Sequence, residues 1–125
     1  MARKKSPTLT EAELRLMEII WSKGSANTTD VLKALPGDEQ LAYTTVLTTL
    51  RILEDKGYVR HTKEGKAFVY HPVAGRDEVS RGALRLLISN FFKNSPALLV
   101  SNLIADETLS AKELRRLKKM IEESE

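Results

Sequence analysis

The stretch that decides the fold is residues 41–72, LAYTTVLTTLRILEDKGYVRHTKEGKAFVYHP. In its first half Val46, Leu50 and Leu53 lie at positions i, i+4 and i+7, which places them in one stripe along a helix. Such spacing is typical of a helix that buries one face and exposes the other. The pattern therefore predicts a helix from about residue 42 to residue 56.

Two β-rich runs follow this helix. Residues 58–63 and 66–71 contain valine, threonine, tyrosine and phenylalanine, which favour strands. Between the runs lies Glu64-Gly65, a two-residue connection that is typical of a hairpin turn. The pattern predicts a two-stranded hairpin that ends at Pro72.

Two further helices precede the deciding stretch. Thr10 and Glu13 form a capping box at the start of the first helix. The second begins after Thr28 and is broken by the proline and glycine of residues 36–38. The apolar positions at helical spacing in the first helix are Leu14, Met17, Ile20 and Trp21. Three helices followed by a hairpin predict a winged helix-turn-helix over residues 9–73, in a chain that is mainly α.

The last part of the chain, residues 74–125, is again helical and very apolar. The patterns predict helices over residues 76–92 and 97–105 and a third helix after a capping box at Ser110. One small three-helix region cannot cover all of its own apolar stripes. We therefore expect a C2 homodimer, with a second small core inside a monomer as the alternative. The side chains expected at the dimer surface are Leu84, Leu87, Ile88, Phe91, Leu98, Leu99, Leu103, Ile104, Leu117 and Ile121.

The helix over residues 42–56 has a polar face opposite its buried stripe. Threonine is a poor helix former, so an exposed threonine-rich face calls for a functional explanation. A threonine hydroxyl can bond a phosphate or a base edge, and an arginine can pair with a phosphate or a guanine. Lysines at the wing tip can reach phosphates, although a solvated surface is the plainer alternative. The residues predicted to bind DNA are Thr28, Tyr43, Thr44, Thr45, Thr48, Arg51, Lys63 and Lys66.

The first eight residues form a separate basic segment. Residues 1–8 contain Arg3, Lys4 and Lys5, and they predict a flexible arm that reaches neighbouring phosphates or is simply solvated. No apolar region follows these basic residues, so they do not resemble a secretory signal, and we expect a cytoplasmic protein. The net charge of +3 is by itself weak support for a nucleic-acid partner.

Composition argues against several other classes of protein. The chain has no cysteine, which excludes disulfides, thiolate metal sites and a cysteine nucleophile. The two histidines, His61 and His71, have no carboxylate cluster nearby in the sequence, so we expect no metal. With the predicted turn His61 lies opposite Phe68 and packs on the wing. No phosphate loop or nucleophile motif is present, so we expect neither an enzyme nor a cofactor.

Two other functions compete with DNA binding. Some winged helices bind proteins, and the threonine and arginine face argues against that function here. A ligand-sensing repressor would need a pocket with converging polar groups, for which residues 74–125 are too short and too apolar.

Beyond these patterns, the chain resembles the penicillinase-repressor family, the repressors of β-lactamase and methicillin-resistance operons. The resemblance extends from about Leu9 to Ile121. The stretches that carry it are LTEAEL at 9–14 through Trp21, LAYTTV at 41–46, LEDKG at 53–57, FVYHP at 68–72 and DETLS at 106–110.

The resemblance implies a winged helix followed by a helical dimerisation region, and a target that is a dyad built around TACA and TGTA. It also implies that the repressor leaves its promoter when a sensor pathway leads to proteolysis of the dimerisation region. The matching cleavage position here is Asn102-Leu103, where well-known members have phenylalanine after the asparagine.

Overall fold

The structure is a computed structural model that describes residues 8–124. Its contacts divide the chain into two compact units, one ending at Ala83 and one beginning at Leu84. The boundary between them falls within a helix, ten residues after the boundary of residues 73/74 that the sequence predicts. The predicted arm lies outside the described residues except for Thr8.

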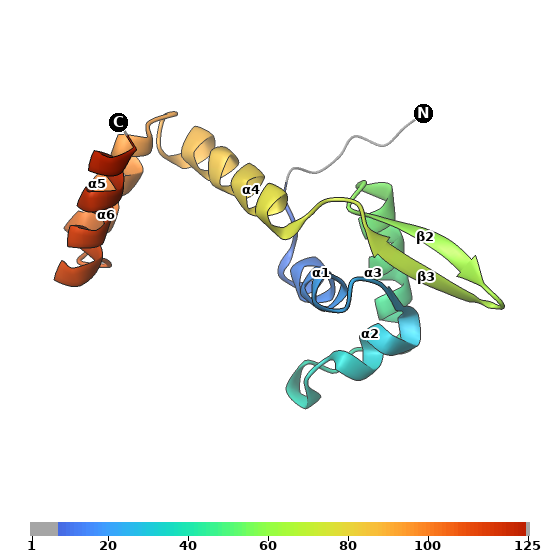
Figure 1. The fold of residues 1–125 in the computed structure, drawn as a ribbon. Helices are drawn as coiled ribbons and strands as arrows, with labels where there is room; N and C mark the ends of the chain where they lie inside the picture. The colour runs from blue at the N-terminus through green and yellow to red at the C-terminus, as the bar shows by residue number, and fades with distance from the viewer. Residues whose placement is uncertain (1–7, 125) are drawn as a thin grey trace. The chain divides into compact units, whose positions relative to one another are not determined.

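The N-terminal unit has the predicted winged-helix order (Figure 1). A short 3-10 helix that the sequence did not predict, Gly37–Glu39, separates the second and third α-helices. The other elements are α1 (Glu11–Lys23), β1 (Ala26–Asn27), α2 (Thr28–Ala34), α3 (Tyr43–Asp55), β2 (Val59–Glu64) and β3 (Ala67–Pro72).

Side-chain caps explain where the first two helices begin. Thr10 accepts from the backbone of Glu13, whose carboxylate accepts from the Thr10 backbone N–H at 2.8 Å. Asn27 and Asp30 make the same reciprocal pair at the start of α2. Each pair satisfies backbone N–H groups that have no partner within the helix, which fixes the first turn.

The hairpin of β2 and β3 turns one residue later than the sequence predicts. The turn residues are Gly65 and Lys66, because Glu64 pairs with Ala67. Gly65 has a φ of 61°, and a glycine at the first central position suits a two-residue hairpin turn. The prediction that His61 lies opposite Phe68 is therefore wrong. His61 pairs with Tyr70, and the ring of Phe68 is a diagonal neighbour at 4.5 Å.

Among the described residues the sheet has a third strand, in the order β1-β3-β2. The sequence did not predict it. Ala26 pairs with Tyr70 and Asn27 with Val69, both antiparallel. A strand of two residues is too short to show alternation, so only its partner reveals it.

The hydrophobic core lies between the helices and the sheet of the N-terminal unit. The predicted α3 stripe is fully buried. In α1, Met17 and Ile20 are buried together with Leu16, whereas Leu14 is 42% exposed. Glu13 is also buried, and its carboxylate accepts from Lys56 Nζ at 2.8 Å. The buried hydrophobic residues are Leu16, Met17, Ile20, Ala26, Val31, Leu35, Val46, Leu50, Leu53, Val59 and Tyr70.

Three helices account for the rest of the chain. They are α4 (Arg76–Phe91), which crosses the boundary between the units, α5 (Pro96–Ala105) and α6 (Ala111–Glu123). Ser95 caps α5, and Ser110 with Glu113 forms the predicted capping box of α6. No side chain of residues 84–124 is buried. Among the described helices, none combines the length and the apolar character that crossing a membrane requires.

Candidate nucleic-acid interface

The outer face of α3 is polar and accessible. Val46, Leu50 and Leu53 are buried, so their stripe faces the core and turns the other side of the helix to solvent. That other side carries the predicted threonines and arginine. The exposed residues are Tyr43, Thr44, Thr45, Thr48 and Arg51.

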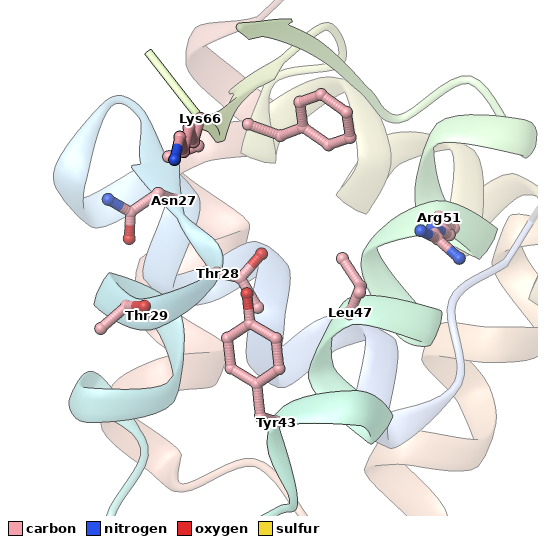
Figure 2. A pocket seen from close by; sticks show the side chains of 9 residues that line it. Asn27, Thr28, Thr29, Tyr43, Leu47, Arg51 and Lys66 are labelled. Carbon is pink, nitrogen blue, oxygen red and sulfur yellow. The ribbon is translucent and has the colours of Figure 1, made fainter. Parts of the chain in front are cut away.

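A groove lies beside this face, between the start of α2, α3 and the wing. Figure 2 shows Tyr43 and Leu47 on α3, with Thr28 of α2 near the end of the Tyr43 side chain. The groove has a volume of about 240 Å³. Its lining residues are Asn27, Thr28, Thr29, Tyr43, Leu47, Arg51, Lys66, Ala67 and Phe68.

The chemistry of the groove suits a nucleic-acid backbone. Arg51 and Lys66 provide cations, and hydroxyl and amide groups from the start of α2 provide further hydrogen-bond donors. Phosphate oxygens are the partners that such donors commonly find at protein–DNA interfaces. Leu47, Ala67 and Phe68 add apolar surface that can contact a sugar or a thymine methyl.

The structure brings only some of the predicted DNA-binding residues into this groove. Tyr43, Arg51 and Lys66 line it together with Thr28, whose side chain is almost covered, at 6% exposure. The others, Thr44, Thr45, Thr48 and Lys63, are exposed but do not line the groove.

Sequence reasoning missed five lining residues. Asn27 is the N-cap of α2, and Phe68 lies on β3. Both line the same groove as residues of α3, a meeting of three elements that local patterns do not encode. Helical spacing does offer a signal for Leu47, which lies four residues after Tyr43 and four before Arg51 and therefore shares their side of α3. The missed residues are Asn27, Thr29, Leu47, Ala67 and Phe68.

A carboxylate ties the wing to the end of α3. Glu54 accepts from the backbone N–H of His61 at 3.1 Å, and its two oxygens lie 2.7 and 2.8 Å from His61 Nδ1. The His61 ring also lies beside Phe68 of the groove. Glu54 and His61 are seven residues apart and on different elements, so no local sequence pattern pairs them. Among the described residues no cluster of potential ligands is suited to a metal ion.

Comparison with known proteins places the chain in a family. The family model described as penicillinase repressor matches residues 9–123. The chain belongs to the penicillinase repressor family. The match covers both units of the structure, as the resemblance predicted.

Two curated relatives align over almost their full length. The penicillinase repressor of Bacillus licheniformis is 32% identical over 120 residues, which is 96% of this chain and 94% of the relative. The methicillin resistance regulatory protein MecI of Staphylococcus aureus strain N315 is 24% identical over 117 residues, which is 94% of this chain and 95% of MecI.

A solved structure supports the assignment of the N-terminal fold. The DNA-binding domain of the repressor BlaI is similar with a TM-score of 0.54 and 38% identity, over 61% of this chain and 93% of that domain. A second similar structure is the monomeric form of Bacillus licheniformis BlaI in complex with the blaP half-operator. Its TM-score is 0.50 and its sequence identity is 38%, over 61% of this chain and 93% of the BlaI chain. Both confirm the winged helix.

Proposed function

We propose that this protein is a homodimeric transcriptional repressor that binds an inverted repeat of the TACA/TGTA type in promoters of β-lactamase-type or related operons. The observation that carries this proposal is the polar outer face of α3 beside the groove that holds Arg51 and Lys66. A relative with the same winged helix was solved on a half-operator, which supports DNA as the partner.

Two kinds of contact divide the work of binding. Lysine and arginine contacts with phosphates provide affinity that depends on salt but not on sequence. Side chains of α3 that reach base edges provide the choice of sequence. The polar and accessible residues Thr44, Thr45 and Thr48 are therefore our candidates for base contacts, with Lys63 and Lys66 at the wing as phosphate contacts.

The exposure of the C-terminal unit supports the homodimer. Leu84, Leu87, Leu98, Ile104 and Ile121 are each more than a third exposed in the single chain. An apolar groove between α5 and α6 offers a second chain a place to pack. Its lining residues are Val100, Ile104, Leu114, Leu117 and Ile121, with the charged residues Lys118 and Glu122. Large exposed apolar surfaces on small proteins commonly mark interaction sites. Two joined reading units convert two weak half-site contacts into one tight complex.

Relief of repression by proteolysis is the remaining part of the proposal. The bond between Asn102 and Leu103 lies inside α5, and the Asn102 side chain donates to the Leu98 carbonyl at 2.8 Å. A protease linked to a sensor needs this turn to open before it can cut. Because α5 buries no side chain in the single chain, opening is cheapest when the second chain is absent.

Selection of random duplex DNA by the purified full-length chain at near-physiological salt tests the proposal. We expect enrichment of an inverted repeat with half-sites about one helical turn apart. Enrichment of a single half-site would contradict the dimeric function. Salt-sensitive background binding without any enrichment would contradict sequence-specific repression and would favour a winged-helix protein-interaction module. A ligand-sensing repressor would be favoured by a separate result, a small molecule that shifts the unfolding temperature of the protein and releases it from DNA.

A further inference from the structure

The junction between the winged helix and α4 is held by a set of contacts within the N-terminal unit, which we call the α4 clamp: Glu18, Trp21, Ala74 and Arg76. The indole Nε1 of Trp21 donates to the Ala74 carbonyl at 2.9 Å. Arg76 Nη1 lies 2.6 Å from Glu18 Oε2, and the guanidinium lies over the Trp21 ring at 5.2 Å from its centroid. The clamp thus joins α1 to the first turn of α4.

The linker that leads into α4 is short and tied along its length. Three residues separate the end of β3 from Arg76. The backbone N–H groups of Val73 and Ala74 both donate to the Tyr58 carbonyl, at 2.8 and 3.3 Å. Together with the bond from Trp21, these contacts leave the linker little freedom to swing. The first turn of α4 is therefore held against α1.

Arg76 occupies a position where a cation is locally unfavourable. It is the first residue of α4, where the partial positive charge of the helix dipole disfavours a basic side chain. Glu18 and Trp21 offer it a compensating anion and an aromatic face. Exposed ion pairs and exposed cation–π contacts add little to folding stability. The contribution of the clamp lies in geometry more than in stability.

We propose that Arg76, through Glu18 and Trp21, is a positioning residue that sets the half-site spacing this repressor accepts. The inference rests on the proposed homodimeric function, because α4 begins at the reading unit and carries Leu84, Leu87 and Phe91 of the proposed dimer surface. The advantage of a second half-site depends on the effective concentration of the second reading unit at that site, and this falls as the connection loosens. A tied α4 therefore favours one spacing, and a loosened α4 accepts several.

The test measures the affinity of the full-length protein for duplexes that carry one half-site or two. In the duplexes with two half-sites, the spacing is varied around about one helical turn, to shorter and to longer values. Three variants are compared with the unchanged chain. Arg76→Ala removes the cation of the clamp, and Glu18→Gln breaks the same ion pair without removing a positive charge that could contact DNA. Arg81→Ala is the matched control, because it removes the same charge five residues further along α4.

We expect Arg76→Ala and Glu18→Gln to broaden the spacing profile and to lower the preference for the best full site over a single half-site about tenfold. Dimerisation should stay unchanged in both clamp variants, and the affinity for a single half-site should stay unchanged in Glu18→Gln. The control Arg81→Ala should keep the narrow spacing profile of the unchanged chain. A narrow profile in both clamp variants would overturn the inference while leaving the proposed function intact. If the unchanged chain itself fails to prefer two half-sites over one, the proposed function fails and the inference with it.

Discussion

The two units of this repressor differ in how much of their apolar surface they cover by themselves. The N-terminal unit surrounds side chains such as Leu16, Leu50 and Tyr70 so completely that they are at most 1% exposed. In residues 84–124 of the single chain, no side chain reaches that state, and Phe91 is 74% exposed. The difference indicates that the reading unit closes a core of its own, whereas the helical unit by itself leaves its apolar side chains at least partly exposed, which is the surface that the proposed second chain would cover.

The largest expected effect comes from breaking the core of the reading unit. Leu50→Ala should lower the free energy of unfolding by about 2–5 kcal/mol, because it removes a fully buried side chain and leaves a cavity. Denaturant unfolding of the full chain measures this loss. Leu14→Ala is the matched control, since Leu14 is 42% exposed and lies outside the proposed dimer surface, and it should lower the free energy of unfolding far less. Equal losses in the two variants would contradict the closed core of the reading unit.

A charge in the helical unit should act on assembly and on DNA together. Leu103→Asp places a carboxylate on the surface that we expect a second chain to cover. We expect it to weaken dimerisation and to lower operator affinity by about a hundredfold, because the second half-site is no longer linked to the first. Sedimentation and operator titration measure the two effects. Ser101→Asp, an exposed neighbour in α5, is the control. Unchanged sedimentation and unchanged operator affinity in Leu103→Asp would contradict the dimer surface.

A substitution on the reading helix should act on DNA alone. Arg51→Ala should weaken operator binding by about 1–3 kcal/mol without altering dimerisation, since Arg51 is exposed and lines the groove. A loss that depends on the sequence of the duplex would assign Arg51 to a base, and a uniform loss with a smaller salt dependence would assign it to a phosphate. Arg15→Ala on α1 is the matched loss of an arginine. No change in affinity would remove Arg51 from the interface.

The smallest effect concerns pH and the buried carboxylate of Glu13. Burial raises the pKa of Glu13, but hydrogen bonds from Lys56 and the Thr10 backbone together outweigh it, so the pKa lies below its ordinary value of 4.5. Because the pKa of Glu13 is lower in the folded chain than in the unfolded chain, the unfolded chain binds more protons at this carboxylate between the two values. The stabilisation that the Glu13 carboxylate provides is therefore complete above pH 4.5, and it is lost as the pH falls through the pKa of Glu13 in the folded chain.

The measurement for Glu13 compares the free energy of unfolding of the unchanged chain with that of Glu13→Gln across this range. We expect the difference between the two proteins to shrink as the pH falls below 4.5. Because burial and the hydrogen bonds oppose each other, this change should be smaller than the effects above. A difference that is constant from neutral pH to below that value would contradict the assignment.

The same contrast between the units explains what could be predicted from the sequence. The α3 stripe of Val46, Leu50 and Leu53 and the capping boxes are local patterns, and the structure confirms them. The pairing of Ala26 with Tyr70 and of Glu54 with His61 depends on chain crossings that no local pattern encodes. Leu14 and Leu16 are both apolar residues of α1, and only the direction in which the helix packs decides that Leu16 is buried and Leu14 is exposed.

The candidate site shows the same division. Tyr43 and Arg51 could be named from residue type and helix position, and Lys66 from its place at the wing tip, and all three line the groove. Phe68 could not, because its place in the groove follows from the register of the hairpin and the pairing of β3 with β1. The dimer surface and the cleavage position are still predictions, because they concern a second chain and a protease.

The position of the hairpin turn has a consequence for how the wing can change in length during evolution. Moving the turn by one residue, from Glu64-Gly65 to Gly65-Lys66, changes the partner of His61 by two positions, from Phe68 to Tyr70. Because side chains alternate between the two faces of a strand, this shift leaves every residue on its original face. We therefore expect relatives to tolerate insertions or deletions of two residues at the tip of the wing. An insertion or deletion of one residue within a strand would turn Phe68 away from the groove, and we expect selection to remove it.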